Sequence, residues 1–389
     1  MVLDWIKHRL KGDYVIWTVV FILCMISTLV VYSAVSARAF RQTEGNTEVF
    51  LIRHVIYLCI AVSAIWIVHN VNYRYFSNIS RFLLILSAVL LVYAFFAGVA
   101  INGASRWVRI PLLGITFQPS DLAKLALVSN LASLLAKRQK NIEDFKAALL
   151  PALLWSGGIC LLIALSDLSS ACVLMATCML IMFIGRVKIK HLFNLIVICL
   201  IGIVFALKIG QRWETAKSRV QDWWAVVTGN LDKGDTDVPY QVERAYMAIA
   251  SGGIPGTGLS NGQGRHSLPE AYADYVYAVI VEEGGLILGA IVLFLYIVLL
   301  YRGMVVLSKS QDPYGGLLAT GLSFSLVVQA FVNMAVVVGL GPVTGLPLPM
   351  ISMGGTSLLF TGVTIGIILS VSRANQLKEQ NLGLAKKDE

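Results

Sequence analysis

Long apolar runs separated by short polar or basic segments make up most of the chain. A helix needs roughly 20 mostly apolar residues to cross about 30 Å of hydrocarbon, so each run is a candidate membrane span. The first run is too long for the core of a cleavable signal peptide, and we expect it to be retained. The pattern predicts ten spans: Val15–Ser36, Val49–Val68, Phe82–Ala100, Leu122–Leu135, Ala147–Leu165, Ala171–Ile184, Phe193–Ile209, Asp274–Tyr301, Leu317–Val338 and Ile351–Val371.

Composition leads to the same fold class. Hydrophobic residues make up 57% of the 389 residues and charged residues 14%, and the mean hydropathy is +0.76, which is too apolar for one soluble core. We therefore expect an all-α, polytopic membrane protein in which residues 1–389 form one transmembrane domain. The longest segment outside the bilayer is predicted at 210–273, between the seventh and eighth spans. The six cysteines lie in apolar runs and are expected to be small packing residues.

The distribution of basic residues predicts that both termini are cytoplasmic. With the N-terminus inside, the predicted cytoplasmic segments carry eighteen lysines and arginines. The short outer loops carry five, which are Arg38, Arg41, Arg53, Arg106 and Arg109. The long outer segment is left out, because long loops cross largely regardless of charge. Orientation thus accounts for most of the net charge of +9, and nucleic acid is not expected as a partner.

Ionisable residues gather at the outer ends of three predicted spans. Asp121 and Lys124 begin the fourth span, Asp167 ends the fifth and Asp274 begins the eighth. Any one of them alone could lie among the lipid headgroups with its charge in water. Charges at membrane depth are costly and usually functional, so the group predicts a polar cavity open to the outer side. There Asp121 and Lys124 could pair at i, i+3, with Asp167 or Asp274 as a second partner for the ammonium.

Two further segments are unusual for membrane helices. Glu282 and Glu283 lie about 12 Å beyond Asp274 at the helical rise of 1.5 Å per residue, and two glycines follow them. The glycines predict a kink or a close approach of a neighbour, while the glutamates either bind donors inside the bundle or contact substrate. Gly339–Gly355 is rich in glycine and proline. It is expected to be irregular, either as a wall of the outer cavity or as an ordinary tight connector.

Several long motifs run from one end of the chain to the other. They are NGASRW (Asn102–Trp107), FQPSDLAK (Phe117–Lys124), YQ (Tyr240–Gln241), IASGG (Ile249–Gly253), LPEAYADYVYAVIVEEGG (Leu268–Gly285) and GLPLPMISMGG (Gly345–Gly355). With these motifs the chain resembles the SEDS family, the group of FtsW and RodA. The LPEA stretch and the run RVQDWW (Arg219–Trp224) resemble FtsW more than RodA.

The resemblance implies a peptidoglycan glycosyltransferase that polymerises lipid II at the outer face of the bacterial cytoplasmic (inner) membrane. The implied partners are a class B penicillin-binding protein, other divisome or elongasome membrane proteins, and polyprenyl-linked glycan. Asp274 matches the family's essential aspartate and is the expected catalytic residue. Residues expected to bind substrate are Lys124, Asp121, Asp167, Arg106, Arg109, Gln241, Glu282, Ser352, Gly354 and Gly355. A divalent cation, Mg²⁺ or Mn²⁺, remains an alternative means of holding the substrate diphosphate.

The chain departs from the family pattern at several positions. Tyr272 and Ala273 stand where relatives usually have His-Thr, and residues 166–170 read SDLSS in place of a PDLGT-like motif. Thr116 occupies a position that is usually basic, so Arg106 or Arg109 is expected to supply that cation.

Two other functions fit parts of the pattern. A transporter or lipid flippase would also bury Asp and Lys, but its relay should run through the membrane, whereas these charges gather at one face. A non-enzymatic division scaffold would not need charges inside the membrane. An assay for glycan polymer made from lipid II distinguishes an enzyme from either a transporter or a scaffold.

Overall fold

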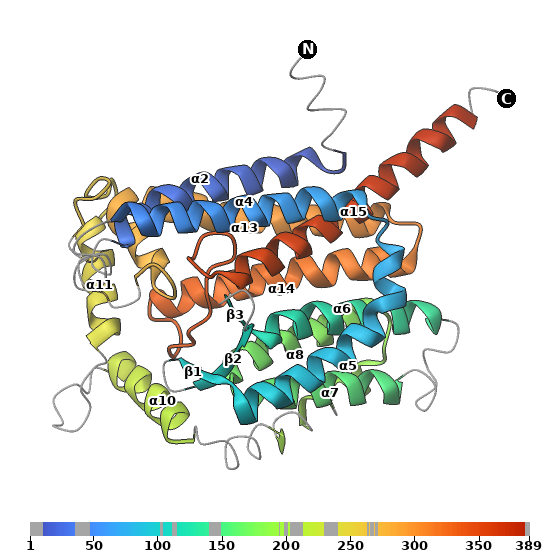
Figure 1. The fold of residues 1–389 in the computed structure, drawn as a ribbon, viewed down its shortest axis with the longest axis horizontal. Coiled ribbons are helices and arrows are strands. Elements are labelled where there is room, and N and C mark those ends of the chain that lie inside the picture. The colour runs from blue at the N-terminus through green and yellow to red at the C-terminus, as the bar shows by residue number, and fades with distance from the viewer. Residues whose placement is uncertain are drawn as a thin grey trace.

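The computed structural model describes residues 11–35, 47–101, 104–110, 115–139, 149–193, 195–197, 201–202, 213–228, 240–262, 264, 268 and 271–385. Long helices lie side by side in one bundle, with α10 and α11 across one end (Figure 1). The elements are α2 (Tyr14–Ala34), α4 (Thr47–Asn70), α5 (Arg74–Ala97), β1 (Val99–Ile101), β2 (Ala104–Ile110), β3 (Ile115–Phe117), α6 (Pro119–Lys137), α7 (Leu150–Ala164), α8 (Leu168–Ile184), α10 (Trp213–Thr228), α11 (Tyr240–Gly252), α13 (Val276–Lys309), α14 (Pro313–Val337) and α15 (Thr356–Ala385).

Six of these helices are long and apolar enough to cross a membrane: α2, α4, α5, α13, α14 and α15. Two shorter apolar helices, α7 and α8, match the predicted fifth and sixth spans. The chain is therefore a multi-pass membrane protein, as the hydropathy pattern predicts. The predicted seventh span, Phe193–Ile209, lies largely outside the described residues.

Helix α6, the predicted fourth span, lies inside the bundle. It packs against α5, α7, α8 and α14, and most of its apolar and serine side chains are buried. Protein rather than lipid therefore surrounds it. This explains how a helix that begins with Asp121 and Lys124 is tolerated at membrane depth.

The fold is helical as predicted, apart from three short strands that correct the end of the third predicted span. The third helix, α5, ends at Ala97, and Val99–Ile101, predicted as the end of the third span, forms β1 instead. Antiparallel pairing joins β1 to β2 and β2 to β3. Extended backbone at Gly98 ends the helix, and the next residues are rich in the β-branched and aromatic types that favour strands.

The predicted irregularity after Glu283 is confirmed as a kink in α13. Gly285 has φ of 68° and ψ of −175°, and a Cβ there would lie 2.1 Å from the carbonyl oxygen of Ile254. Glycine is required both by this left-handed backbone and by the close approach. The kink frees the carbonyl of Glu282, which accepts a hydrogen bond from the backbone N–H of Thr257 at 2.9 Å. The glycine-rich segment before α13 therefore supports the kink.

The start of α2 and the end of α15 lie at the same end of the bundle (Figure 1). Gly12 and Gln376 exchange two hydrogen bonds of 3.2 and 3.1 Å there. This arrangement agrees with termini on one side of the membrane. The predicted irregular connection is also confirmed, because α15 begins at Thr356 and not at Ile351.

The prediction for the cysteines is partly wrong. Cys160 and Cys178 are buried, but Cys59 and Cys172 are exposed on the outside of the bundle. Lipid-facing positions need only apolar character, so a run of apolar residues does not reveal which of its members pack inside. Cys199 lies outside the described residues.

Candidate active site

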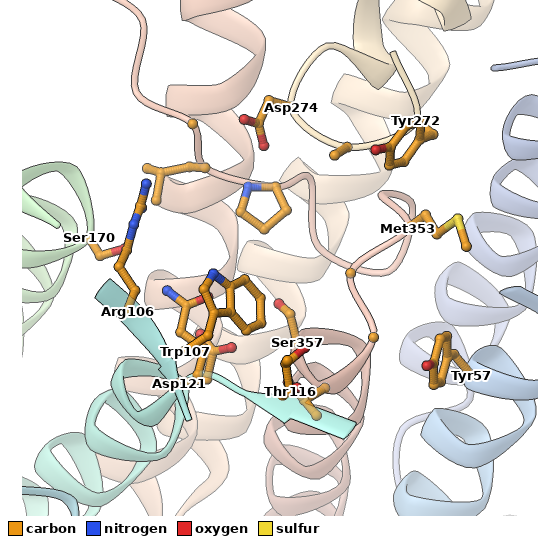
Figure 2. A pocket seen from close by; sticks show the side chains of 18 of the residues that line it. Tyr57, Arg106, Trp107, Thr116, Asp121, Ser170, Tyr272, Asp274, Met353 and Ser357 are labelled. Carbon is orange, nitrogen blue, oxygen red and sulfur yellow. The ribbon is translucent and has the colours of Figure 1, made fainter. Parts of the chain in front are cut away.

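A cavity of about 650 Å³ lies at the end of the bundle opposite Gly12 and Gln376. Figure 2 shows Arg106 and Ser170 on one side of it, Tyr57 on the other, and Asp274 and Tyr272 above Trp107. The wall includes Phe50, Arg53, Tyr57, Arg106, Trp107, Thr116, Gln118, Asp121, Lys124, Asp167, Ser170, Tyr272, Ala273, Asp274, Gly345, Leu346, Pro347, Met353, Gly354, Gly355, Thr356 and Ser357. The four ionisable residues that the sequence placed at one depth thus share one cavity.

Lys124 and Asp121 form the predicted pair within α6. Lys124 Nζ lies 3.1 Å from Asp121 Oδ1, and the two side chains are 15% and 9% exposed. The second oxygen of Asp121 is buried, and no hydrogen-bond partner for it exists among the described residues. This wall of the cavity therefore carries a paired cation, Lys124, and a carboxylate oxygen of Asp121 that can accept a further hydrogen bond.

Asp167 pairs with Arg106 rather than with Lys124, which corrects one expectation. Arg106 Nη1 donates to Asp167 Oδ2 at 2.9 Å. Asp167 also caps α8, accepting the backbone N–H of Ser170 at 3.1 Å and its hydroxyl at 2.9 Å. Charge-assisted bonds of this kind fix geometry as well as charge. They hold Arg106, which comes from β2, against the start of α8.

Asp274 lies just before α13, and its backbone is held from α14. Asn333 Nδ2 donates to the carbonyl oxygens of Asp274 at 2.8 Å and Leu346 at 2.7 Å. Gly345 has φ of +67°, and a Cβ there would lie 3.4 Å from Asp274 Oδ2. One asparagine therefore ties the segment with the candidate base to the irregular connection after α14.

The predicted wall role of Gly339–Gly355 is confirmed for part of that connection. Gly354 and Gly355 both line the cavity. Ser352 does not: it is 2% exposed, accepts the N–H of Leu348 at 2.7 Å and donates to the carbonyl of Ala273 at 2.6 Å. The structure thus places Ser352 beneath the wall, where it supports backbone. We call residues 348–353 the outer turn.

Besides Ser352, three predicted substrate-binding residues are not brought to the cavity wall. Arg109 is exposed on β2, directly across from Thr116 of β3. Gln241 lies on α11. Glu282 is buried, and its carboxylate oxygens accept the backbone N–H of Gly264 at 2.9 and 3.1 Å. A role in substrate binding remains a prediction for each of them.

Sequence reasoning missed the α4 wall of the cavity, which carries Phe50, Arg53 and Tyr57. Arg53 was counted with the outer-loop cations although it falls inside the predicted span Val49–Val68. It lies in the second turn of α4 with its guanidinium 5.9 Å from the Phe50 ring. No carboxylate among the described residues lies within ion-pair distance of it. A lone arginine inside a predicted span was the available signal, because a charge at that depth usually marks function.

The family model described as cell cycle protein, FTSW_RODA_SPOVE, matches residues 13–377. The chain belongs to the FtsW–RodA–SpoVE family. It is similar to a probable peptidoglycan glycosyltransferase FtsW of Geobacter metallireducens, with 33% identity over 94% of this chain and 96% of the relative. It is also similar to the stage V sporulation protein E of Bacillus subtilis, with 32% identity over 94% of this chain and 98% of the relative.

Solved structures agree with this family. One, described as the structural coordination of polymerization and crosslinking by a peptidoglycan synthase complex, gives a TM-score of 0.69 at 26% identity, covering 94% of this chain and 98% of that one. The Thermus thermophilus rod shape determining protein RodA gives a TM-score of 0.64 at 26% identity, covering 95% and 99%. Within the family, the sequence relatives named above place this chain on the FtsW-like side.

Proposed function

We propose that this chain is a peptidoglycan glycosyltransferase that polymerises lipid II at the outer face of the bacterial cytoplasmic membrane. The observation that carries the proposal is the cavity in which Asp274 lies together with Arg53, Arg106 and Lys124. The names of FtsW relatives with coverage of nearly the whole chain support it. Both termini and eighteen cations on the cytoplasmic side, ten spans, and an outer segment between the seventh and eighth complete the proposed topology.

Asp274 is the proposed general base. Its carboxylate takes the proton from the acceptor sugar hydroxyl as the hydroxyl oxygen attacks the donor carbon. The bond from that carbon to the lipid diphosphate breaks, and the diphosphate leaves with the electron pair. Attack opposite the leaving group converts an α-linked donor into a β-linked product. The backbone bonds from Asn333 and Ser352 keep the base at a fixed position for this step.

The cations of the wall hold the diphosphate in this mechanism. Lys124 and Arg106 are each partly neutralised by a carboxylate. Arg53 has no such partner among the described residues and is a full positive charge on the α4 wall. Exposed apolar residues Ile52 and Ile56 lie beside it on α4. A diphosphate at Arg53 would therefore leave its polyprenyl chain free to enter lipid along this helix.

A divalent cation has no assembled protein site in the part of the chain that the structure describes. No group of three His, Cys, Asp or Glu residues that could hold a metal occurs there. The carboxylates of Asp121 and Asp167 are already paired with Lys124 and Arg106. In the proposed mechanism the cations of the chain therefore bind the diphosphate, and chelation followed by readdition measures the effect of Mg²⁺ or Mn²⁺.

A class B penicillin-binding protein is the proposed partner, together with other divisome or elongasome membrane proteins. A solved relative belongs to a peptidoglycan synthase complex, which supports a partner of this kind. We expect polymerisation to be low for the isolated chain and to rise when the cognate class B protein is added. Full-rate polymerisation alone, unchanged by any class B protein of the same genome, would contradict this dependence.

The decisive experiment supplies lipid II to the purified chain with its partner and looks for glycan polymer. Polymer formation that requires this chain supports the enzyme. Movement of lipid II across a vesicle membrane without polymer would instead favour a flippase, and neither activity would favour a scaffold. A partner preparation without this chain controls for polymerase contamination.

A further inference from the structure

The outer turn contains a residue in a conformation that side chains rarely adopt. Met350 is buried and has φ of +65°, in the left-handed region that favours glycine. The carbonyls on both sides of it accept hydrogen bonds from buried hydroxyls of two membrane helices. Tyr296 of α13 donates to Pro349, and Ser27 of α2 donates to Ile351 at 2.8 Å. A backbone of this kind persists only where its surroundings hold it, and such sites cluster near function.

The contact of Ser27 extends to His54 of α4. Ser27 Oγ lies 2.8 Å from His54 Nε2, and both side chains are fully buried. The single hydroxyl proton of Ser27 goes to the carbonyl of Ile351, which can only accept. The hydroxyl oxygen must therefore accept from His54, and this assigns the neutral tautomer with its proton on Nε2. His54 Nδ1 is buried and has no hydrogen-bond partner among the described residues, so no acceptor is available for a proton on it, and the ring is assigned as neutral.

The outer turn in turn holds the segment that ends in Asp274. Ser352 Oγ donates to the carbonyl of Ala273 at 2.6 Å. The backbone N–H of Met353 donates to the carbonyl of Tyr272 at 2.9 Å. Two consecutive carbonyls before Asp274 thus depend on the outer turn, which itself is tied to α2 and α4.

We infer that His54 is a positioning residue, which acts through Ser27 to set the outer turn and with it the place of Asp274. His54 does not line the cavity, so it does not touch substrate. Its neutral ring instead fixes the direction of the Ser27 hydroxyl toward Ile351. The expected effect on rate rests on the proposed function, while the effect on the outer turn does not.

The structural part is tested by amide hydrogen exchange of the purified full chain. The N–H groups of Leu348 and Met353 are the reporters, because both donate inside this network. His54→Leu and Ser27→Ala should each speed their exchange by roughly tenfold or more. His54→Gln, which can present an N–H near the position of Nε2, should keep it close to wild type.

His69 offers a matched control in the same helix. It is buried at the other end of α4, with its ring 5.4 Å from that of Trp17. His69→Leu removes a buried imidazole from α4 just as His54→Leu does. It should lower thermal stability and leave exchange of the two reporter amides unchanged. Faster exchange there in both leucine variants would show general loosening and overturn the inference.

The kinetic part uses polymerisation of lipid II with the partner present. His54→Leu and Ser27→Ala should lower kcat about 10- to 100-fold with KM little changed, because a displaced base slows the chemical step and not binding. His54→Gln should recover most of the rate. Unchanged reporter exchange in His54→Leu and Ser27→Ala, or faster exchange with normal kcat, would refute the positioning role. If wild type makes no polymer, the proposed function fails, and exchange alone decides the link between His54 and the outer turn.

Discussion

The two ends of the bundle use charged residues differently. At the end near Gly12, Asp13 caps α2 by accepting the N–H of Val15 at 2.9 Å, and it also pairs with Arg302 of α13. At the cavity end, the charges instead surround an open volume of about 650 Å³. Aspartates and arginines occur at both ends. Near Gly12 they cap helices and pair with one another, whereas at the other end they line a cavity.

A second helix cap near Gly12 also uses its charge to stabilise the bundle. Asp312 caps α14 and accepts hydrogen bonds from the Tyr73 hydroxyl at 2.8 Å and from Arg74 Nε at 3.3 Å. Burial, followed by the hydrogen bond to Asp312, raises the pKa of Tyr73 to about 12. The stabilisation from a tyrosine whose pKa is raised is present below its ordinary value of about 10 and is lost as pH rises through about 12. The Tyr73 contact therefore persists throughout the physiological range.

Asp274→Asn should have the largest effect on polymerisation, and it gives the clearest contrast between the cavity end and the end near Gly12. The change keeps the shape of the side chain but removes the base, so we expect polymerisation to fall roughly 10²- to 10⁴-fold with thermal stability near wild type. Asp312→Asn is the control at the other end. It should reduce stability by about 1–3 kcal/mol and leave the rate per folded molecule unchanged. A purified Asp274→Asn protein that polymerises within about threefold of wild type would exclude Asp274 as the base.

Lys124→Ala should lower polymerisation about 10- to 100-fold, the effect of losing one charge-assisted contact to a diphosphate. The variant also leaves Asp121 without its cation at membrane depth. The double variant Asp121→Ala/Lys124→Ala also removes the carboxylate that would be left unpaired. We expect it to stay inactive while regaining stability, as measured by polymer assay and thermal melting. Recovery of activity in the double variant would show that Lys124 serves mainly to neutralise Asp121.

The comparison of the two ends also shows what could be predicted from sequence. Most of the spans, the shared cavity and the Asp121–Lys124 pair follow from hydropathy, the distribution of basic residues and i, i+3 spacing, all of which can be read along the chain. The pairing of Arg106 with Asp167 does not follow, because it depends on a strand that replaces the end of a predicted span.

The support beneath Asp274 could not be predicted for a related reason. Asn333 and Ser352 act on backbone carbonyls that lie 59 and 79 residues away in the chain. Contacts of this kind are set by how helices pack, and no periodic pattern records them. Arg53 differs, because its place inside the apolar run Val49–Val68 was a local signal that sequence reasoning did not use.

Arg53→Ala should have a smaller effect and tests whether an unpaired cation serves the cavity. Arg53 is exposed, so its loss should raise KM about threefold to tenfold with kcat and stability near wild type. Arg74→Ala is a suitable control, because Arg74 is an exposed arginine at the opposite end. Lowering the ionic strength should enlarge the difference for Arg53 alone, since screening weakens exposed charges. Identical KM values for wild type and both variants would remove Arg53 from the site.

Glu282→Gln should have the smallest effect on catalysis, although Glu282 lies in the cavity half of α13. Its carboxylate accepts the N–H of Gly264 and, at 3.4 Å, the hydroxyl of Ser251. In this it resembles Asp13 and Asp312, which accept backbone N–H groups at the opposite end. The amide keeps one acceptor, so we expect a loss of about 1 kcal/mol in stability and a nearly normal rate. Glu282→Ala removes both of these contacts and should cost more stability. A raised KM in the Gln variant at normal stability would instead mean that Glu282 contacts substrate. The substrate-binding region would then extend along α13 as far as Glu282.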